Sequence, residues 1–423
     1  MKVYSRTSFP LPVEQLNAMV EWLSGFTENK GSGVTRLLYS EEWLEAQEAL
    51  KRKMEEGGLD TYYDDTGNLF GRLEGTKDAD STVLTGSHID SVVNGGKYDG
   101  AYGIIASFLA VEYLYRKYGR PSKTIEVVSL CEEEGSRFPL TFWGSGNITG
   151  IYKDKDITHI ADKSGVSLKE AMNKAGFGRG IHRLPYRENI EAFIELHIEQ
   201  GSVLEKSGNS LGVVTHIVGQ RRYTVSIKGK SNHAGTTPMQ DRHDAMTTAA
   251  ELITYITAKV QKTDPHLVAT VGKLDATPNV PNVIAGEVSF TLDIRHYDEG
   301  MLGKVCAEIF HHFEVVSQEK KVNISFSQWT DVKPVEMDAS LQEKAIGVST
   351  RQQLSFQKML SGAGHDAQLF GTHCPTSLIF VPSVNGVSHS PEEYTKAEDL
   401  TQGVQMLTEL LYEMAYDNGG EEK

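Results

Sequence analysis

Cysteine is scarce in this sequence, with Cys131, Cys306 and Cys374 standing far apart in a chain of 423 residues. An odd and sparse set of this kind provides neither a disulfide framework nor a zinc motif built from paired cysteines. Cys131 and Cys374 lie in apolar, strand-like runs. We therefore expect buried, unreactive thiols at these positions and not nucleophiles.

Long apolar runs and a surplus of positive charge are also missing. No segment approaches the roughly 18 apolar residues of a membrane-spanning helix, and residues 1–10 do not have the pattern of a signal peptide. Lys and Arg total 42 against 57 Asp and Glu, which gives a formal net charge of −15. This charge argues against nucleic acid or an anionic membrane as a partner. We expect a cytoplasmic protein.

Predicted strands alternate with predicted helices over much of the chain, without internal repeats or low-complexity tracts. This order predicts an α/β fold, in which ligands bind beyond the carboxyl ends of the strands. The expected helices span residues 13–26, 40–57, 101–118 and 397–416, and the expected strands span residues 83–85, 124–130, 192–196 and 376–381.

Residues 211–329 have a different pattern and predict an inserted domain. Their helices and alternating strands suggest a β-α-β-β-α-β module, an α+β unit with helices on one face of an antiparallel sheet. We interpret this module as a lid or dimerisation domain. It interrupts a catalytic α/β domain formed by residues 1–210 and 330–423.

Imidazole and acidic side chains follow the predicted strands in short segments marked by glycine. His88 and Asp90 would face the same way on an extended segment, so Asp90 would fix the tautomer of a liganding His88. A surface histidine with a capping aspartate fits these two residues equally well. Asp99 begins the helix at 101–118, where it serves as an N-cap, as a carboxylate that bridges two ions, or as both.

Glu132, Glu133 and Glu134 directly follow the strand at 124–130. Carboxylates this close repel one another, and a nearby cation would offset the repulsion. One glutamate can then bind metal while its neighbour acts as the general base. An exposed acidic turn would have the same sequence.

His197 and His389 complete the candidate set. His197 alternates with Glu195 and Glu199 on a polar strand face, which suits either a cleft or a solvated edge strand. His389 lies in a loop, where a histidine usually has no special role. Taken together, the segments suit two divalent ions, which clamp a carbonyl and activate water at neutral pH. The sequence thus predicts a metal-dependent hydrolase.

Further candidates lie outside these segments. His233, in the same module as Asn282, lies in a loop that is either a plain connection or the source of a donor to an oxyanion. Arg295 shares a strand face with Asp293, and it either binds a substrate carboxylate or forms a surface ion pair. Gly364 lies in a glycine-rich turn whose backbone N–H groups can face an anion.

From about Thr35 to Tyr416, these segments resemble, in this order, the M20 family of metallopeptidase-like amidohydrolases. They are similar to the branch that holds the N-carbamoyl-L-amino-acid hydrolases, the yeast-type β-ureidopropionases and the allantoate amidohydrolases. A histidine at position 197 marks this branch, because the peptidase relatives use a carboxylate there.

The resemblance implies a role for each candidate. Glu133 would act as general base and then as acid, and His233 would stabilise the oxyanion. The loop that carries His233 reaches the active site of the partner subunit in this family, so a homodimer is implied. One ion would be bound by Asp99, Glu134 and His389 and the other by His88, Asp99 and His197, while the substrate would be contacted by Gln200, Arg222, His233, Asn282, Arg295 and Gly364.

Within the branch, residues 35–40, 135–145 and 385–389 favour allantoate, a small anion with two ureido arms, as the substrate. Related carbamoyl-amino-acid hydrolases usually carry smaller residues in place of Phe142 and Trp143. The expected reaction gives ureidoglycine, ammonia and carbon dioxide, in purine nitrogen salvage. An N-carbamoyl-L-amino-acid hydrolase or a β-ureidopropionase is the alternative, and a di-metal aminopeptidase or an inactive binding protein is a more distant one. Manganese is the expected metal, although zinc suits the mixed ligand set equally well.

Overall fold

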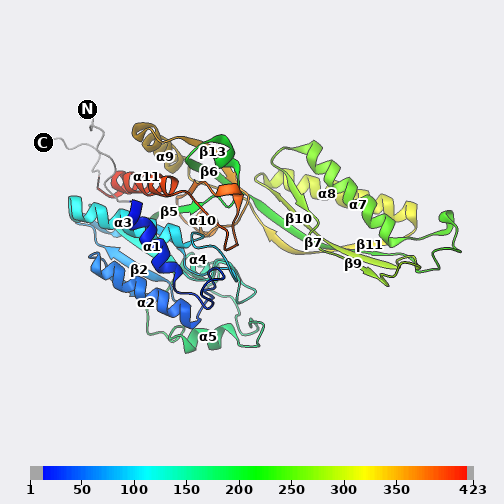
Figure 1. Cartoon of the computed structure of the whole chain (residues 1–423), viewed down its shortest axis with the longest axis horizontal. Helices are drawn as coiled ribbons and strands as arrows, with labels where there is room; N and C mark the ends of the chain where they lie inside the picture. Colours follow the sequence, from blue (N-terminus) through cyan, green and yellow to red (C-terminus); the bar gives the residue numbers. More distant parts are fainter. Residues whose placement is uncertain (1–12, 417–423) are drawn as a thin grey trace. The chain divides into compact units, whose positions relative to one another are not determined.

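A computed structural model describes residues 13–416, which form two compact units (Figure 1). Unit 1 holds the chain up to Thr215 and again from Glu336 onward, and unit 2 holds His216–Val335. Unit 2 begins later than the insertion expected at residue 211. The reason is strand β6 (Leu211–Ile217), which pairs with β14 (Thr376–Val381) in the sheet of unit 1.

Unit 1 is built on a nine-stranded mixed sheet. Its four central strands lie in the order β4, β3, β5 and β14 and are parallel, so their carboxyl ends meet at one edge. Flanking strands run antiparallel to them. The strands other than β6 and β14 are β1 (Asp60–Tyr63), β2 (Leu69–Leu73), β3 (Asp78–His88), β4 (Lys123–Leu130), β5 (Ile190–Ile198), β12 (Val335–Glu336) and β13 (Phe356–Ser361).

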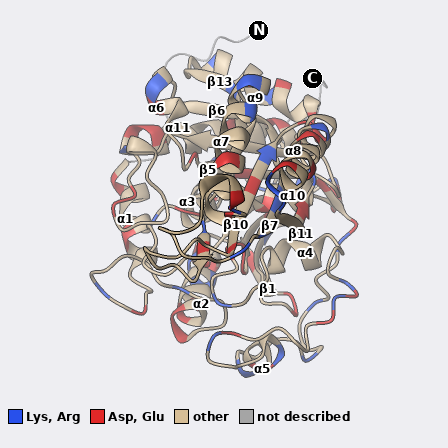
Figure 2. Ribbon diagram, turned by 90° about the vertical axis from the view of Figure 1, so that its right-hand side faces the viewer, with Lys and Arg blue, Asp and Glu red and all other residues tan. Residues whose placement is uncertain are grey.

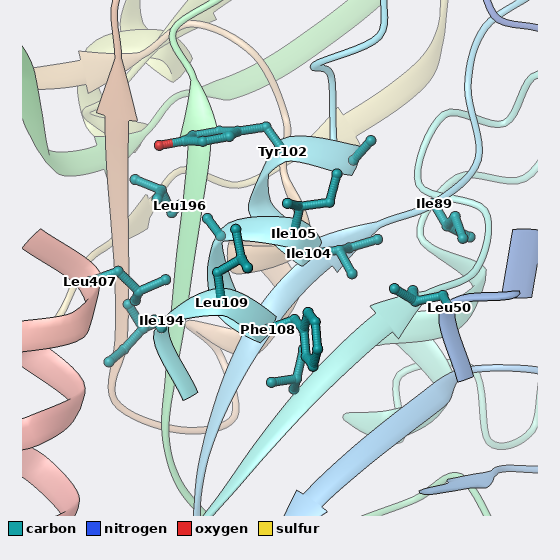
Figure 3. Close-up of a cluster of buried hydrophobic side chains, with 14 of the residues drawn as sticks. Leu50, Ile89, Tyr102, Ile104, Ile105, Phe108, Leu109, Ile194, Leu196 and Leu407 are labelled. Atoms are coloured by element: carbon teal, nitrogen blue, oxygen red, sulfur yellow. The ribbon is translucent and has the colours of Figure 1, made fainter. Parts of the chain in front are cut away.

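Helix α3 (Ala101–Tyr118) occupies the centre of the unit 1 core. Its residues are apolar on nearly every side from Ala101 to Val111, as expected for a helix covered all round. Figure 3 shows Ile104, Ile105, Phe108 and Leu109 packed with Ile194 and Leu196 of β5 and with Leu407. The α/β prediction is thereby confirmed. The other helices of unit 1 are α1 (Val13–Ser24), α2 (Glu41–Glu56), α4 (Trp143–Ile148), α5 (Leu168–Lys174), α6 (Val203–Ser207), α9 (Ala339–Gln352), α10 (Asp366–Phe370) and α11 (Ala397–Ala415), with a 3-10 turn at Val384–Gly386.

Unit 2 is a five-stranded antiparallel sheet with helices on one face. Alternate residues such as Val225 and Phe290 pack under the helices, while Thr224 and Thr291 face the opposite way. This arrangement matches the expected α+β module, with two short strands preceding β10 where one was anticipated. The elements are β7 (Gly219–Lys228), a 3-10 turn at Met239–Asp241, α7 (Ala245–Thr263), β8 (Val268–Thr270), β9 (Leu274–Thr277), β10 (Glu287–His296), α8 (Glu299–Lys320) and β11 (Asn323–Val332).

The two chain connections between the units run side by side. In unit 1, the N–H group of Met337 donates to the carbonyl oxygen of Thr215 at 2.9 Å. In unit 2, Gln220 and Val332 are paired between β7 and β11. In each unit, the segment that leaves for the other unit is therefore hydrogen-bonded to the segment that returns.

Charged residues of both signs are spread over the elements of the structure (Figure 2). Figure 2 shows Lys and Arg interspersed with Asp and Glu over the helices. Within residues 13–416, no helix is both long and apolar enough to cross a membrane. Cys131 and Cys306 are buried, and burial raises the pKa of the partly covered Cys374 thiol to about 11.

Candidate metal centre

Five side chains proposed as metal ligands converge at the carboxyl edge of the central strands. His88 is the last residue of β3, and His197 precedes the last residue of β5. Glu134 follows β4, and His389 follows β14. Asp99 comes from the loop between β3 and α3. Because the four strands are parallel neighbours, residues up to 301 positions apart in sequence, from His88 to His389, meet here.

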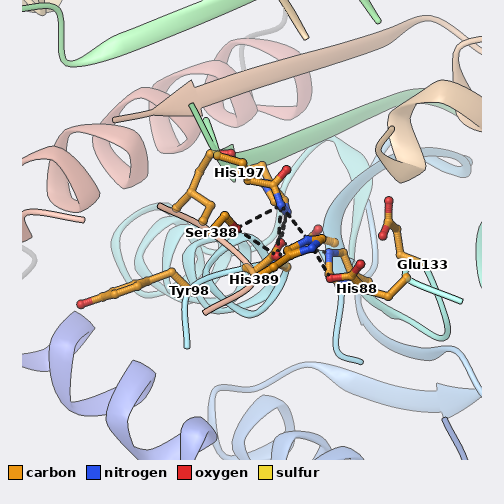
Figure 4. Close-up of polar contacts among 12 residues, drawn as sticks. His88, Tyr98, Glu133, His197, Ser388 and His389 are labelled. Atoms are coloured by element: carbon orange, nitrogen blue, oxygen red, sulfur yellow. Dashed lines mark hydrogen bonds and ion pairs between the residues drawn. The ribbon is translucent and has the colours of Figure 1, made fainter. Parts of the chain in front are cut away.

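The Asp99 carboxylate contacts the imidazoles of His88, His197 and His389. Figure 4 shows these three histidines gathered together. The Oδ1 atom of Asp99 is 3.6 Å from Nε2 of His88 and 3.2 Å from Nε2 of His197. Its Oδ2 atom is 3.2 Å from Nε2 of His389, which also lies 3.4 Å from Oε1 of Glu134. The two oxygens of one carboxylate thus face two different sets of partners.

Backbone carbonyl groups orient the two buried histidines. Nδ1 of His88 lies 3.1 Å from the carbonyl oxygen of Asp90, and Nδ1 of His197 lies 2.8 Å from that of Ile198. Each Nδ1 must carry the proton to make this hydrogen bond, which leaves the lone pair on Nε2 for a metal. The ring orientation is therefore set before any ligand binds.

The ligand atoms are close enough to share cations. His88, Asp99 and His197 form one group within 4.8 Å, and Asp99, Glu134 and His389 form another. Both groups use Asp99, whose Oδ1 atom is buried without a hydrogen-bond donor. A mixed set of neutral imidazole nitrogens and carboxylate oxygens suits divalent zinc or manganese. On this geometry the residues fit two divalent ions.

The electrostatics of the cluster reflect carboxylates and imidazoles that are packed together. Although burial opposes ionisation, the imidazoles of His197, His389 and His88 around the carboxylate hold the pKa of Asp99 well below its usual range. Burial, with the charge of Asp99, raises the pKa of Glu134 to about 7. The negative charge gathered here is the kind that bound cations offset.

Glu133 lies beside the cluster and is joined to it by none of the dashed contacts in Figure 4. It nevertheless has a carboxylate oxygen within 4.8 Å of ligand atoms of His88 and Glu134. Burial raises its pKa well above the usual range, while the His88 imidazole acts in the opposite direction. His88, Glu133 and Glu134 thus form a third group that could hold a cation, and a buried carboxylate here that stays unligated is suited to accept a proton.

The role of Asp90 differs from the sequence-based expectation. Its carboxylate is 3.7 Å from Nδ1 of His88, which bonds instead to the Asp90 backbone. The two carboxylate oxygens accept the N–H groups of Glu133 and Glu134, each at 3.1 Å. Asp90 thus fixes the turn that carries Glu133 and Glu134. Its position two residues after His88 was the only signal in the sequence.

Gln200 reaches into the ligand cluster. Its side-chain amide nitrogen lies 3.0 Å from Oδ2 of Asp99 and 3.4 Å from Nε2 of His389. Gly364 lies in the loop between β13 and α10. A Cβ atom at this position would lie 3.0 Å from the Phe142 ring. The backbone N–H of Phe142 donates to the carbonyl oxygen of Glu133 at 3.2 Å.

Trp143 does not share the position of Phe142. It is 4% exposed, belongs to the hydrophobic core and donates from Nε1 to the hydroxyl of Tyr39 at 3.0 Å. The two neighbouring aromatic residues therefore have different surroundings, with the Phe142 ring against Gly364 and Trp143 in the core. The sequence could not separate them, because a 3.6-residue turn points neighbouring side chains in different directions.

The two arginines predicted to bind substrate lie on neighbouring strands of unit 2, β7 and β10. Nε of Arg222 donates to Oδ2 of Asp293 at 2.8 Å, and Arg295 donates to both oxygens of Asp293 at 2.9 and 3.0 Å. Gln220 also donates to Asp293, at 2.7 Å. Asp293 therefore holds both guanidinium groups on one polar sheet face.

His233 and Asn282 lie on paired segments of unit 2, beyond the ends of β7 and β10. The N–H of Ala234 donates to the carbonyl oxygen of Asn282 at 3.0 Å. The ring of His233 is exposed, and its Nδ1 accepts the N–H groups of Gly235 and Thr236 at 3.1 and 3.2 Å. The ring proton must then lie on Nε2, which leaves an outward-facing donor.

Comparisons with known proteins agree with this geometry. The model of Peptidase family M20/M25/M40 matches residues 84–413. Allantoate amidohydrolase of Bacillus subtilis (strain 168) is 48% identical over 397 residues, which cover 94% of this chain and 96% of that protein. N-carbamoyl-L-amino-acid amidohydrolase of Paenarthrobacter aurescens is 34% identical over 400 residues, covering 94% and 97%. A solved amidase of the hydantoinase/carbamoylase family from Burkholderia multivorans has a TM-score of 0.92 at 31% identity, covering 97% and 100%.

Proposed function

The chain belongs to the peptidase family M20/M25/M40, and from this premise we propose that it hydrolyses a ureido C–N bond of allantoate with two divalent ions. The observation that carries the proposal is the position of Asp99. One oxygen faces His88 and His197, and the other faces His389. This is the arrangement that a carboxylate bridging two ions requires, and it forms at an edge where α/β folds bind ligands.

Two divalent ions bound by these ligands would polarise the ureido carbonyl and lower the pKa of a water molecule. Glu133 would take a proton from the attacking water, because its buried carboxylate has a raised pKa and lies next to His88 and Glu134. It would then pass that proton to the leaving nitrogen. One water adds to the carbon, the C–N bond breaks, and ureidoglycine leaves together with carbamate, which decomposes to ammonia and carbon dioxide.

His233 is proposed to donate a hydrogen bond to the carbonyl oxygen as negative charge develops on it. Since its Nδ1 accepts two backbone N–H groups, Nε2 carries the proton and faces outward. Donors placed in this way in advance are worth about 3 to 4 kcal/mol of barrier in comparable sites. Asn282, on the segment paired with that of His233, is proposed to contact the same substrate.

Arg222 and Arg295 are proposed to bind the carboxylate of the substrate. Arg222 and Lys228 are six positions apart on β7, a distance of about 20 Å along an extended strand, and the pairing continues outward toward His233. A substrate as small as allantoate cannot span this distance. The separation supports a homodimer in which the His233 loop serves the active site of the partner subunit, with unit 2 as the dimerisation domain.

Allantoate is favoured over an N-carbamoyl-L-amino acid by two observations. Identity is 48% to the allantoate amidohydrolase and 34% to the carbamoyl-amino-acid enzyme over similar lengths. Phe142, held with a left-handed backbone at φ 58°, places its ring against Gly364, and its N–H donates to the carbonyl oxygen of Glu133. A bulky ring at this position suits a small substrate with a second ureido arm.

The test is ammonia release by the protein reconstituted with Mn²⁺ and, separately, with Zn²⁺. Allantoate is compared with a panel of N-carbamoyl-L-amino acids and with N-carbamoyl-β-alanine. We expect ammonia from allantoate and at least about tenfold less from the other substrates. Release from the carbamoyl amino acids alone would retain the metal centre and the base but replace the substrate. No release from any ureido compound would reject the proposal.

A further inference from the structure

The loop that carries His389 has little regular structure to hold it. It runs from the end of β14 at Val381 to the start of α11 at Ala397, with one 3-10 turn within it. His389 has a left-handed backbone at φ 56°, and its side chain is 49% exposed. The side chains of the other four proposed ligands are at most 8% exposed. Packing alone therefore does little to fix His389.

Glu393 connects this loop to the loop that carries Asp99. Its side chain is buried, and its Oε1 atom accepts the N–H groups of Tyr98 at 2.9 Å and Asp99 at 3.1 Å. Its Oε2 atom accepts the hydroxyl proton of Ser388 at 2.8 Å. One carboxylate thus holds the backbone of a bridging ligand with one oxygen and the residue before His389 with the other.

The surroundings of Glu393 are shaped for this contact. A Cβ atom at Gly96 would lie 2.0 Å from Oε1, so only glycine lets the carboxylate lie against that stretch of backbone. The neighbouring Tyr394 packs edge-on against Tyr98, with ring centroids 6.4 Å apart. Within residues 13–416, Glu393 takes part in no ion pair, and the three hydrogen bonds are what offsets its burial.

The two loops do not depend on Glu393 to the same degree. The backbone of Asp99 is also tied to the first turn of α3, since its carbonyl oxygen accepts the N–H of Ala101 at 2.6 Å. Oδ1 of Asp99 faces two histidines that are fixed on strands. In contrast, the Glu393 carboxylate holds the His389 loop through the hydroxyl of Ser388. Loss of the Glu393 carboxylate would therefore release His389 more than Asp99.

We propose that Glu393 is a positioning residue that ties the His389 loop to the Asp99 loop and so maintains the ion site formed by Asp99, Glu134 and His389. It touches neither the substrate nor an ion and acts through Ser388 and the backbone of Tyr98 and Asp99. The inference rests on the proposed function, because it assumes that these ligands bind divalent ions. We expect ion binding at the site formed by His88, Asp99 and His197 to depend much less on Glu393.

The test uses calorimetric titration of the full-length, metal-free protein with Mn²⁺, together with the metal content after dialysis. Glu393→Ala should bind one ion as the wild type does and the second about 10-fold to 100-fold more weakly, which is the usual effect of losing an outer hydrogen-bond partner. Glu393→Gln should remain within about threefold of the wild type, because an amide can accept from both N–H groups and donate to the Ser388 hydroxyl. Glu392→Ala is the matched control, since that neighbouring glutamate is exposed.

Ser388→Ala provides a second variant if Glu393→Ala does not fold, because it removes the hydroxyl that connects Glu393 to the His389 loop. The same substitution removes the longer contacts of this hydroxyl with Oδ2 of Asp99 at 3.4 Å and with Gln200 at 3.3 Å. This variant too should bind one ion more weakly and the other with unchanged affinity. The unfolding temperature of the metal-free protein should not fall. Two unchanged binding events in Glu393→Ala and Ser388→Ala would overturn the inference, as would equal weakening of both ions. A wild-type protein that binds no divalent ion would overturn the inference and the proposed function together.

Discussion

At the scale of single residues, His88, His197 and His233 differ in which ring nitrogen carries the proton. Nδ1 of His88 and of His197 donates to a backbone carbonyl, which leaves Nε2 as a metal ligand. Nδ1 of His233 accepts backbone N–H groups, which makes Nε2 a donor. The local backbone thus gives the same residue type opposite chemical roles, and each tautomer matches the task proposed for it.

Glu133→Gln should separate proton transfer from metal binding. Glu133 is not needed as a ligand, so the variant should retain two ions and its affinity for substrate. Turnover should fall by about 100-fold to 10,000-fold, the range for loss of a general base. Metal content, equilibrium binding of allantoate and kcat check this prediction. A variant with normal kcat would remove Glu133 as the base.

Metal binding should release protons. Hydrogen bonding to Asp99 raises the pKa of His389 to about 9 against the effect of burial, and burial raises that of Glu134 to about 7. Both groups must lose their protons to bind a cation, so the apparent affinity should rise with pH until about pH 9 and then level off. Titrations in buffers with different heats of protonation count the protons released. Equal affinity at about pH 6 and about pH 9 would contradict the prediction.

The sequence indicated the residue types of the site because each stands in a short, glycine-marked segment after a predicted strand. It could not indicate partners that depend on the fold. Asp90 supports Glu133 and Glu134 through their backbone, and Glu393 supports a loop about 290 residues earlier in the chain. Such contacts have no periodic signature, because they join irregular segments that meet only in the folded protein.

At the scale of secondary-structure elements, helix α2 shows how a local signal fixes a boundary. Ser40 is its N-cap, and its hydroxyl oxygen accepts the N–H of Trp43 at 3.2 Å. Ser40→Ala should therefore lower the free energy of unfolding of unit 1 by about 1 kcal/mol. Denaturant titration followed by tryptophan fluorescence measures it, with Ser32→Ala as a control at an exposed loop position. An unchanged midpoint would show that the cap contributes nothing.

Strongly patterned elements were predicted well, and short flanking ones were not. Helix α3 and strand β14 have the bounds expected from their apolar spacing. Strand β3 was predicted as a short buried run at 83–85, but it begins at Asp78, where its residues are polar and partly exposed. Strands β1 and β2, which lie beyond β4 in the same sheet, were missed for a related reason. Short strands such as β2, which contains Gly71 and Arg72, carry too few apolar residues to display a period.

At the scale of the whole molecule, mixing two inactive variants tests the proposed homodimer. A mixed dimer of His233→Ala and Glu133→Gln would contain one site with both residues intact. Random exchange between equal amounts should therefore restore about a quarter of wild-type activity, since half the dimers are mixed and each has one working site. Ammonia release after subunit exchange measures the recovery.

His233→Ala mixed with Asn282→Ala is the matched control for this experiment. Both residues lie on adjoining segments of unit 2, so every site in the mixed dimer would lack one of them. No recovery is expected in this mixture. Equal recovery in the two mixtures, or none in either after confirmed exchange, would count against a contribution from the partner subunit.

The paired connections at Thr215 and Met337 also bear on the order in which the chain folds. For unit 1, the 120 residues from His216 to Val335 (335 − 216 + 1) act as one long loop, and closing such a loop in its unfolded state costs about 4 kcal/mol of chain entropy. If unit 2 folds first, its own pairing of Gln220 with Val332 brings the loop ends together beforehand. The folded insertion would then hold the two halves of unit 1 close together and so speed the folding of unit 1.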